Sequence, residues 1–146
     1  MTTFFLKYNF NGDSFLIKTK YDIRGNEIKW QETPMGSFTL VDFWFHSCEY
    51  CIQQFPELKS IYEEFHPQVF EIIGITVDHD RYVGDWLSTI QQHQLPWQQY
   101  RDRNGVQSEK YLIKDFPTNF LLNAKGEIIA KNIDPVKLTA FLKEHL

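Results

Sequence analysis

The two cysteines of the chain, Cys48 and Cys51, constrain its fold and chemistry more than any other feature. Residues 40–45, directly before them, are rich in β-branched and aromatic side chains and have the length of a buried strand. After them, apolar residues recur at steps of three or four, as in an amphipathic helix. These residues are Ile52, Phe55, Leu58, Ile61, Tyr62 and Phe65. Cys48 is therefore expected where a strand ends and a helix begins.

A cysteine at such a junction is expected to act as a nucleophile. The first turn of a helix offers unpaired backbone N–H groups and the positive end of the helix dipole, and both stabilise a thiolate. The C-x-x-C spacing places the second sulfur within disulfide range, one helical turn further on. We therefore predict that Cys48 attacks a disulfide and that Cys51, which lies deeper, resolves the mixed disulfide.

The same pair is also compatible with a structural disulfide or with half of a zinc site. Zinc normally takes four ligands, often two further cysteines or a closely spaced histidine pair. The chain has only two cysteines, and its five histidines are scattered at His46, His66, His79, His93 and His145. We therefore predict no metal and no cofactor, and the structural disulfide stays as the alternative.

The composition indicates one packed domain and excludes several classes of partner. Of the 146 residues, 42% are hydrophobic and 16% aromatic, which is enough for a real core. The net charge of -4 and the lack of a Lys/Arg cluster argue against a nucleic-acid partner. No apolar run approaches the roughly 20 residues of a membrane-spanning helix, and the first residues do not resemble a signal peptide. The compartment stays open, because two cysteines are compatible with either redox environment.

Patterning along the chain predicts alternating strands and helices. Residues 4–21 read as two strands around Asn11-Gly12-Asp13, and a second short pair is expected around Gly25-Asn26. Further on we expect a buried strand at 69–77, a helix at 81–94, a loop or short strand followed by a helical turn at 98–112, a hairpin at 118–131 and a last helix at 136–145. The short connection at 66–68 predicts a β-α-β unit with parallel strands.

Three further residues gain interest from their positions relative to the cysteines. Asp42 lies in the middle of the apolar strand, where burial raises the pKa of a carboxyl. It is therefore expected to take the proton that Cys51 loses. The alternative is that Asp42 lies at a strand edge that is partly exposed to water. Pro117 directly precedes a strand. A cis peptide bond before Pro117 would turn the Phe116 backbone toward the sulfurs, where that backbone would pair with an extended substrate chain. The alternative is an ordinary trans proline at the start of a strand. Pro56 is expected to kink the helix.

In order and spacing, these motifs closely resemble the thioredoxin superfamily. The shared motifs are VDFW before C-x-x-C, the helix proline, and FPTNFLLN followed by Gly126. The extra helix between Asp80 and Gln94 is similar to that of bacterial thiol-disulfide oxidoreductases of the TlpA/ResA type. The resemblance covers residues 21–146 and implies a thioredoxin-like three-layer α/β/α sandwich with a central mixed sheet and an inserted helix. Residues 1–20 are then expected to form an N-terminal β-hairpin extension.

The resemblance also implies roles for particular residues. Cys48 takes the position of the attacking cysteine, Cys51 that of the resolving cysteine, Asp42 that of the buried acid and Pro117 that of the cis proline. The family has a further acidic residue near the inserted helix, and Asp78 and Asp80 are the two candidates for its position. The implied location is the periplasm or cell envelope, although the residues themselves leave the cytoplasm open.

The active-site rim departs from the family pattern. Ser47 replaces the usual tryptophan, and Glu49-Tyr50 replaces the usual Gly-Pro or Pro-Pro. The charge of Glu49 opposes the helix dipole, so we expect a less depressed Cys48 pKa and a less oxidising couple. Tyr50 and Phe116 are expected to form an aromatic surface that binds substrate, although a solvated charge and ordinary packed rings would explain these residues as well.

The function predicted from these observations is dithiol-disulfide exchange with protein substrates, in the direction of reduction and supplied by an upstream electron donor. The alternative enzyme is a thiol peroxidase of the peroxiredoxin (AhpC/TSA-like) kind, but no threonine precedes Cys48 as it would in that class. A third reading is a thioredoxin-like binding module with an incidental disulfide, whose exposed aromatic residues Tyr50, Trp97 and Phe116 would contact the partner.

Overall fold

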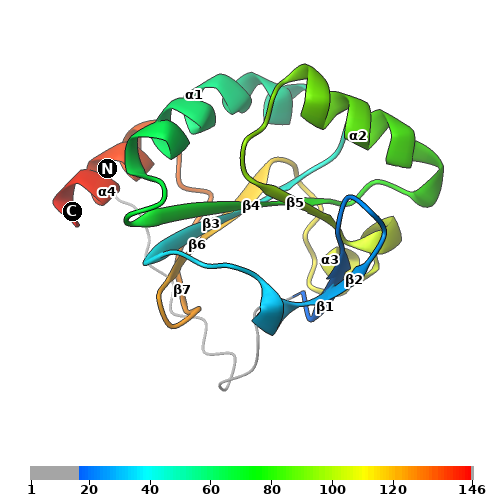
Figure 1. The fold of residues 1–146 in the computed structure, drawn as a ribbon, viewed down its shortest axis with the longest axis horizontal. Helices are drawn as coiled ribbons and strands as arrows, with labels where there is room; N and C mark the ends of the chain where they lie inside the picture. The colour runs from blue at the N-terminus through cyan, green and yellow to red at the C-terminus, as the bar shows by residue number, and fades with distance from the viewer. Residues whose placement is uncertain (1–16, 146) are drawn as a thin grey trace.

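The computed structural model of the protein describes residues 17–145, and one sheet with helices on both faces organises them (Figure 1). The strands are β1 (Thr19–Tyr21), β2 (Glu27–Lys29), β3 (Phe38–Trp44), β4 (Phe70–Thr76), β5 (Gln98–Arg101), β6 (Thr118–Asn123) and β7 (Ile128–Lys131). The helices are α1 (Glu49–Phe65), α2 (Val83–Gln92), α3 (Val106–Lys110) and α4 (Pro135–Glu144), with short 3-10 turns at Trp30–Glu32, Asp80–Tyr82 and Arg103–Gly105. The inserted helix expected between Asp80 and Gln94 is α2.

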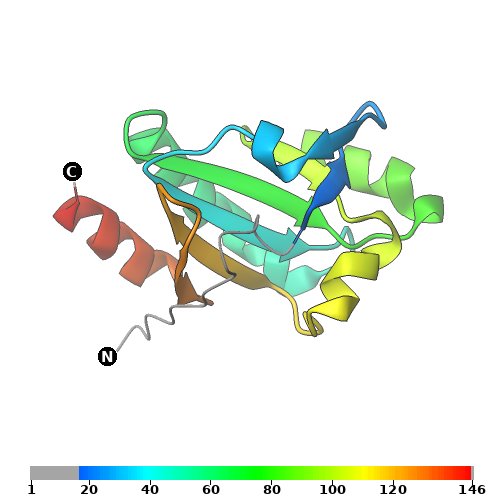
Figure 2. The ribbon, with the colours of Figure 1, turned by 90° about the horizontal axis from the view of Figure 1, so that it is seen from below.

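The sheet is mixed, with the strand order β2-β1-β5-β4-β3-β6-β7 (Figure 2). Strand β4 runs parallel to both β3 and β5, whereas β6 runs antiparallel to β3 and to β7. The predicted β-α-β unit is therefore β3-α1-β4, and the predicted hairpin is β6-β7. Both expectations are confirmed by the observed strand pairings.

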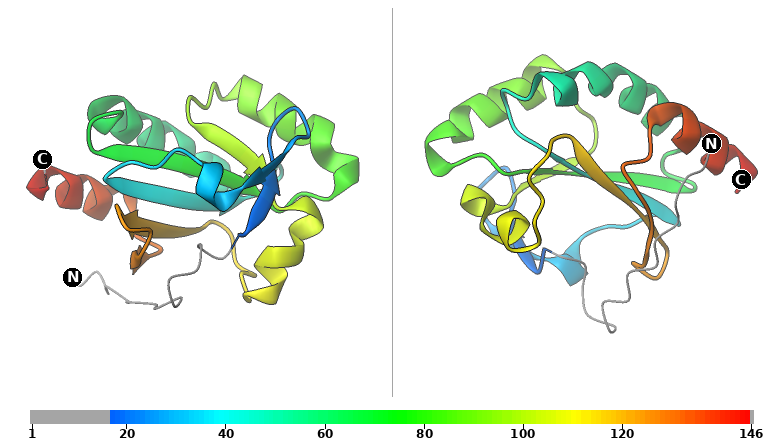
Figure 3. Two further views of the ribbon diagram at one scale, coloured as in Figure 1. Left: turned by 60° about the horizontal axis from the view of Figure 1, so that its bottom comes forward. Right: turned by 180° about the vertical axis from the view of Figure 1, so that it is seen from behind.

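The helices form two unequal layers. Helices α1, α2 and α4 cover one face of the sheet, and the short α3 lies against the other (Figures 1 and 3). Along β3, Leu40 and Trp44 pack into the core under α1, whereas Val41 and Phe43 pack into the core on the opposite face. Burial on both faces explains why β3 reads as an almost continuous apolar run. The expected three-layer α/β/α arrangement is confirmed.

The N-terminal strands join the same sheet. The strand pair predicted around Gly25 is β1-β2, and Gly25 supplies the positive φ of 86° that the turn needs. Strand β1 pairs with β5 through Tyr21 and Arg101, so the expected boundary after residue 20 falls inside a strand of the main sheet. The hairpin expected at 4–21 lies almost entirely outside the described residues, and the separate extension at 1–20 stays a prediction.

Candidate active site

Cys48 and Cys51 form a disulfide at the point where β3 leads into α1. Cys48 is the N-cap of the helix, with extended backbone, and the N–H of Cys51 donates to Cys48 Sγ over 3.2 Å. Cys48 is 4% exposed and Cys51 1% exposed. The predicted junction is therefore observed, and the helix N-terminus directs an N–H donor at the sulfur expected to carry the negative charge.

Asp42 lies in the middle of β3, between Gly74 of β4 and Asn119 of β6. Its side chain is 2% exposed, and its Oδ1 has no hydrogen-bond partner among residues 17–145. Burial raises the pKa of this carboxyl from 3.8 to about 7. Asp42 is therefore not at a wetted edge, and its carboxyl can hold or release a proton near neutral pH. Because side chains alternate along a strand, it faces the same side as Trp44, toward α1.

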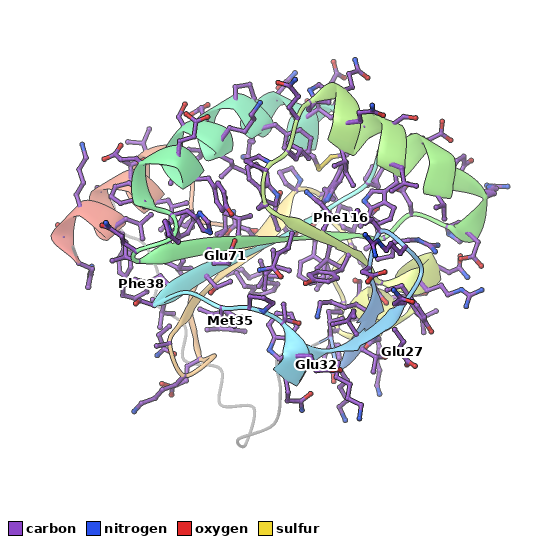
Figure 4. All side chains as sticks on the ribbon, in the orientation of Figure 1. Glu27, Glu32, Met35, Phe38, Glu71 and Phe116 are labelled. Carbon is purple, nitrogen blue, oxygen red and sulfur yellow. A yellow bond between two sulfur atoms is a disulfide. The ribbon has the colours of Figure 1, made fainter. Side chains whose placement is uncertain are left out.

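The connection before β6 lies beside the cysteine loop. In the antiparallel pairing of β3 with β6, Phe43 stands opposite Thr118, so residues 116–117 lie next to the end of β3. The Phe116–Pro117 peptide bond is cis. Phe116, which is labelled in Figure 4, is half-buried. Its ring packs edge-on against Phe45, with ring centroids 5.4 Å apart. Phe116 and Pro117 therefore lie beside the end of β3 that leads into the cysteine loop.

The outer rim is formed by the exposed side chains of Glu49 and Tyr50, and Tyr50 is 71% exposed. Trp97 does not belong to this surface. It is 3% exposed and packs against Tyr62 and Phe55 in the core, with ring centroids 5.7 and 6.4 Å away. The expectation that Trp97 is an exposed contact residue was therefore wrong, because helices α1 and α2 cover this end of β5.

His46 and Thr76 are site residues that the sequence reasoning missed. The buried carboxylate of Asp78 accepts hydrogen bonds from the His46 backbone N–H at 3.0 Å and the Thr76 hydroxyl at 2.5 Å, and it contacts His46 Nδ1 at 2.7 Å. The loop that leads to Cys48 is thereby attached to the end of β4. A histidine two residues before Cys48 and an aspartate just after the parallel strand β4 were the available signals, since parallel strands end at one edge.

The two candidate acids occupy different surroundings. Asp78 lies at the site through its contact with His46, whereas Asp80 is paired with Arg101 at 2.7 Å and with Arg103 at 3.2 Å. Hydrogen bonds from these two guanidinium groups lower the pKa of Asp80 to about 2. Asp80 is therefore an ion-pair residue of the surface and not a proton carrier.

A groove of about 370 Å³ lies beside the cysteine loop. It is lined by Phe45, His46, Ser47, Val77, Asp78, His79, Tyr82 and Phe116. The Tyr82 ring lies against His46, with ring centroids 4.9 Å apart. The groove therefore presents mostly aromatic and imidazole surface next to the disulfide.

The fold and site define a thioredoxin-like protein. The central strand of a mixed sheet leads into a C-x-x-C helix, and a cis-proline connection lies beside the end of that strand. The sequence profile of the AhpC/TSA family matches residues 11–131, and the chain belongs to that family. The resemblance to TlpA/ResA-type proteins is confirmed by relatives of that kind.

Among curated proteins, the chain is 29% identical over 126 residues to the sporulation thiol-disulfide oxidoreductase A of Bacillus subtilis, covering 84% of this chain and 72% of that protein. It is 27% identical over 93 residues to the thiol-disulfide oxidoreductase ResA of Oceanobacillus iheyensis, covering 64% of this chain and 47% of that protein. The chain thus spans about half the length of ResA from that organism.

Solved structures show the same architecture. A thiol-disulfide oxidoreductase from Bacteroides fragilis superposes with a TM-score of 0.75 at 28% identity, covering 88% of this chain and 96% of that one. The thioredoxin domain of a thiol-disulfide oxidoreductase from Bacteroides vulgatus superposes with a TM-score of 0.74 at 30% identity, covering 87% and 91%. These proteins belong to the class that the sequence predicted.

Proposed function

We propose that the protein is a thiol-disulfide oxidoreductase that reduces disulfides of protein substrates through Cys48 and Cys51. The observation that carries the proposal is the disulfide at the start of α1, with the Cys51 N–H directed at Cys48 Sγ. An exchange cycle requires a disulfide between Cys48 and Cys51, and the two sulfurs are close enough to form it. In the dithiol form, the N–H directed at Cys48 Sγ stabilises a thiolate on the attacking cysteine.

The proposed cycle uses three side chains, those of Cys48, Cys51 and Asp42. In the dithiol form, the Cys48 thiolate attacks one sulfur of the substrate disulfide, forms a mixed disulfide and releases the first substrate thiolate. Cys51 then gives its proton to the Asp42 carboxylate and attacks Cys48 Sγ, which releases the second substrate thiolate. Two electrons pass to the substrate, and the protein is left with the disulfide seen in the structure. An upstream dithiol donor then restores the dithiol form.

The substrate is proposed to lie as an extended segment across the rim. Residues 116–117 border the end of β3, where a backbone segment can add to the edge of the cysteine loop. Tyr50 and Phe116 provide aromatic contact area, and the adjoining groove accepts a side chain next to the substrate cysteine. The compartment is proposed to be the cell envelope, as the TlpA/ResA resemblance implies. No helix in residues 17–145 has the length and apolar character needed to cross a membrane.

The experiment that tests the proposed function is insulin reduction with dithiothreitol as donor, measured beside hydrogen peroxide consumption. Faster insulin reduction without peroxide turnover is the expected result, because no threonine stands before Cys48 to support peroxide chemistry. Peroxide turnover in place of insulin reduction would establish the peroxidase. A protein that neither reduces insulin nor consumes peroxide, and whose Cys48–Cys51 disulfide does not form and open reversibly in glutathione buffers, would support the binding module instead of either enzyme.

Replacing Glu49 by glutamine is expected to make the couple more oxidising. Glu49 is exposed in the first turn of α1, where its negative charge opposes thiolate formation at the neighbouring Cys48. Without this charge the dithiol form is stabilised, so the reduction potential should rise by about 10–30 mV and the pH midpoint of thiolate absorbance should fall. Glu57→Gln, an exposed substitution further along α1, is the matched control. A potential that moves equally in both variants would show that Glu49 has no particular role.

A further inference from the structure

Gln99 is a buried polar side chain that the exchange cycle has not used. It is 6% exposed, lies in β5 and pairs with Gly74 of β4, which in turn pairs with Asp42 of β3. Directly paired residues of neighbouring strands point to the same face of a sheet. Asp42 and Gln99 therefore lie in one row across three strands, on the face covered by α1.

Gly74 leaves the space between these two side chains free of any side chain of its own. A Cβ atom added to Gly74 would lie 2.2 Å from Gln99 Oε1 and 2.8 Å from Gln99 Nε2. The Gln99 carboxamide thus lies directly over Gly74, in the place where any other residue would put its side chain. From there, one strand spacing of about 4.8 Å separates it from the strand of Asp42.

Trp44 sets the orientation of this carboxamide. The indole N–H of Trp44 donates to Gln99 Oε1 over 3.2 Å. Because an indole nitrogen only donates, the oxygen of the carboxamide must face Trp44, and the NH2 group is left to donate elsewhere. Among residues 17–145, Gln99 Nε2 and Asp42 Oδ1 are both buried without a hydrogen-bond partner. A donor and an acceptor without partners therefore lie in the same buried row.

We propose that Gln99 is a positioning residue for Asp42, and that its Nε2 group donates a hydrogen bond to the Asp42 carboxylate whenever that carboxyl has released its proton. A buried carboxylate is costly unless it accepts hydrogen bonds, whereas the protonated acid has a smaller need for them. The Gln99 carboxamide therefore favours the form of Asp42 that accepts the proton of Cys51. This meaning for catalysis rests on the proposed function, but the contact itself does not.

Among residues 17–145, the other buried side-chain donors without a hydrogen-bond partner are Trp86 Nε1, Trp97 Nε1 and Arg101 Nε, and none of them lies in the row of Asp42, Gly74 and Gln99. Among the titratable or charged groups of the neighbouring elements, Cys48 is the N-cap of α1, Cys51 lies in its first turn, Asp78 follows β4 and Arg101 ends β5. The same elements also carry Glu49, Tyr50, Glu57, Lys59, Tyr62, Glu63 and Glu64 on α1, Glu71 on β4 and Tyr100 on β5. The cysteines are joined in the disulfide, Asp78 is bonded to His46, and the Arg101 guanidinium is directed to Asp80 at 2.7 Å. In the same row, the uncharged Asn119 uses its side chain on the backbone of Ile133.

The test is an NMR titration of the Asp42 carboxyl carbon in the oxidised protein, which requires no turnover. In Gln99→Met, which keeps the length of the side chain but has no donor, the pH midpoint of Asp42 is expected to rise by about one unit, or tenfold in the proton dissociation constant. Gly74→Ala should shift it in the same direction, because the new methyl group displaces the carboxamide without removing it. The second variant also serves if the first does not fold.

Gln98→Met is the matched control, since Gln98 is the neighbouring glutamine and its Nε2 donates to the Pro34 carbonyl at 2.8 Å, away from Asp42. Its Asp42 midpoint should equal that of the unmodified protein. An unchanged midpoint in both Gln99→Met and Gly74→Ala would overturn the inference, even in a protein that reduces insulin. Conversely, a shifted midpoint in a protein that does not reduce insulin would uphold the contact and overturn only the proposed function.

Discussion

Replacing Cys48 by serine is expected to lower insulin reduction by about a thousandfold or more, because a hydroxyl at this position cannot attack a disulfide at neutral pH. Replacing Cys51 by serine should have a different result. The first attack by Cys48 still occurs, but no second sulfur can release the substrate, so a mixed disulfide should accumulate and be visible as a mass adduct of the intact protein.

Both variants also lose the disulfide itself, so the reduced form of the unmodified protein is the appropriate control for folding. Its melting temperature and those of the variants should be compared in dithiothreitol. A Cys48→Ser protein that still reduces insulin would contradict the assigned attack, and an adduct on Cys48→Ser in place of Cys51→Ser would reverse the two roles. Unchanged binding of a partner in Cys48→Ser would instead support the binding module.

Replacing Asp42 by asparagine is expected to stabilise the protein above neutral pH while slowing the release of substrate. The pKa of Asp42 is raised by burial from 3.8 to about 7. Between these pH values the folded protein still holds a proton that the unfolded chain has lost, so the free energy of unfolding falls as the pH rises. The loss is complete above about pH 7 and amounts to at most about 4 kcal/mol.

Urea unfolding of the oxidised proteins at about pH 4 and about pH 8 measures this effect. The unmodified protein should be less stable at the higher pH, and Asp42→Asn should lack the Asp42 part of that difference. The same variant should accumulate the mixed disulfide near neutral pH, because Cys51 loses its proton acceptor. Equal pH dependence in both proteins would show that the Asp42 carboxyl ionises normally, and the assigned proton transfer would then fail.

The Asp42→Asn variant places an asparagine in the buried row and therefore needs a control at a neighbouring position of that row. Asn119 occupies the same row on β6, and its amide is already bonded to the backbone of Ile133. Asn119→Asp therefore places a second carboxyl beside Asp42, where like charges should push the two titrations apart. A pH profile that changes in Asn119→Asp but not in Asp42→Asn would assign the observed titration to a group other than Asp42.

Local patterns were sufficient to predict most of the elements and the position of the cysteines. The change from a strand run to helical spacing around Cys48 is a property of consecutive residues, and so is the hairpin at 118–131. Cys48 and Cys51 lie one helical turn apart, so the spacing alone brought them within disulfide range. Trp97 was misplaced because a single aromatic residue after Pro96 has no periodicity that could indicate which side is covered.

The sequence by itself therefore determined the redox pair, the strand and helix that carry it, and the burial of Asp42 within an apolar run. Only the tertiary structure decided which polar groups surround that pair. His46 and Asp78 are 32 residues apart, and Trp44 and Gln99 are 55 apart. Contacts over such separations depend on the register of β3, β4 and β5 in the sheet, and this register results from long-range pairing that no local pattern encodes.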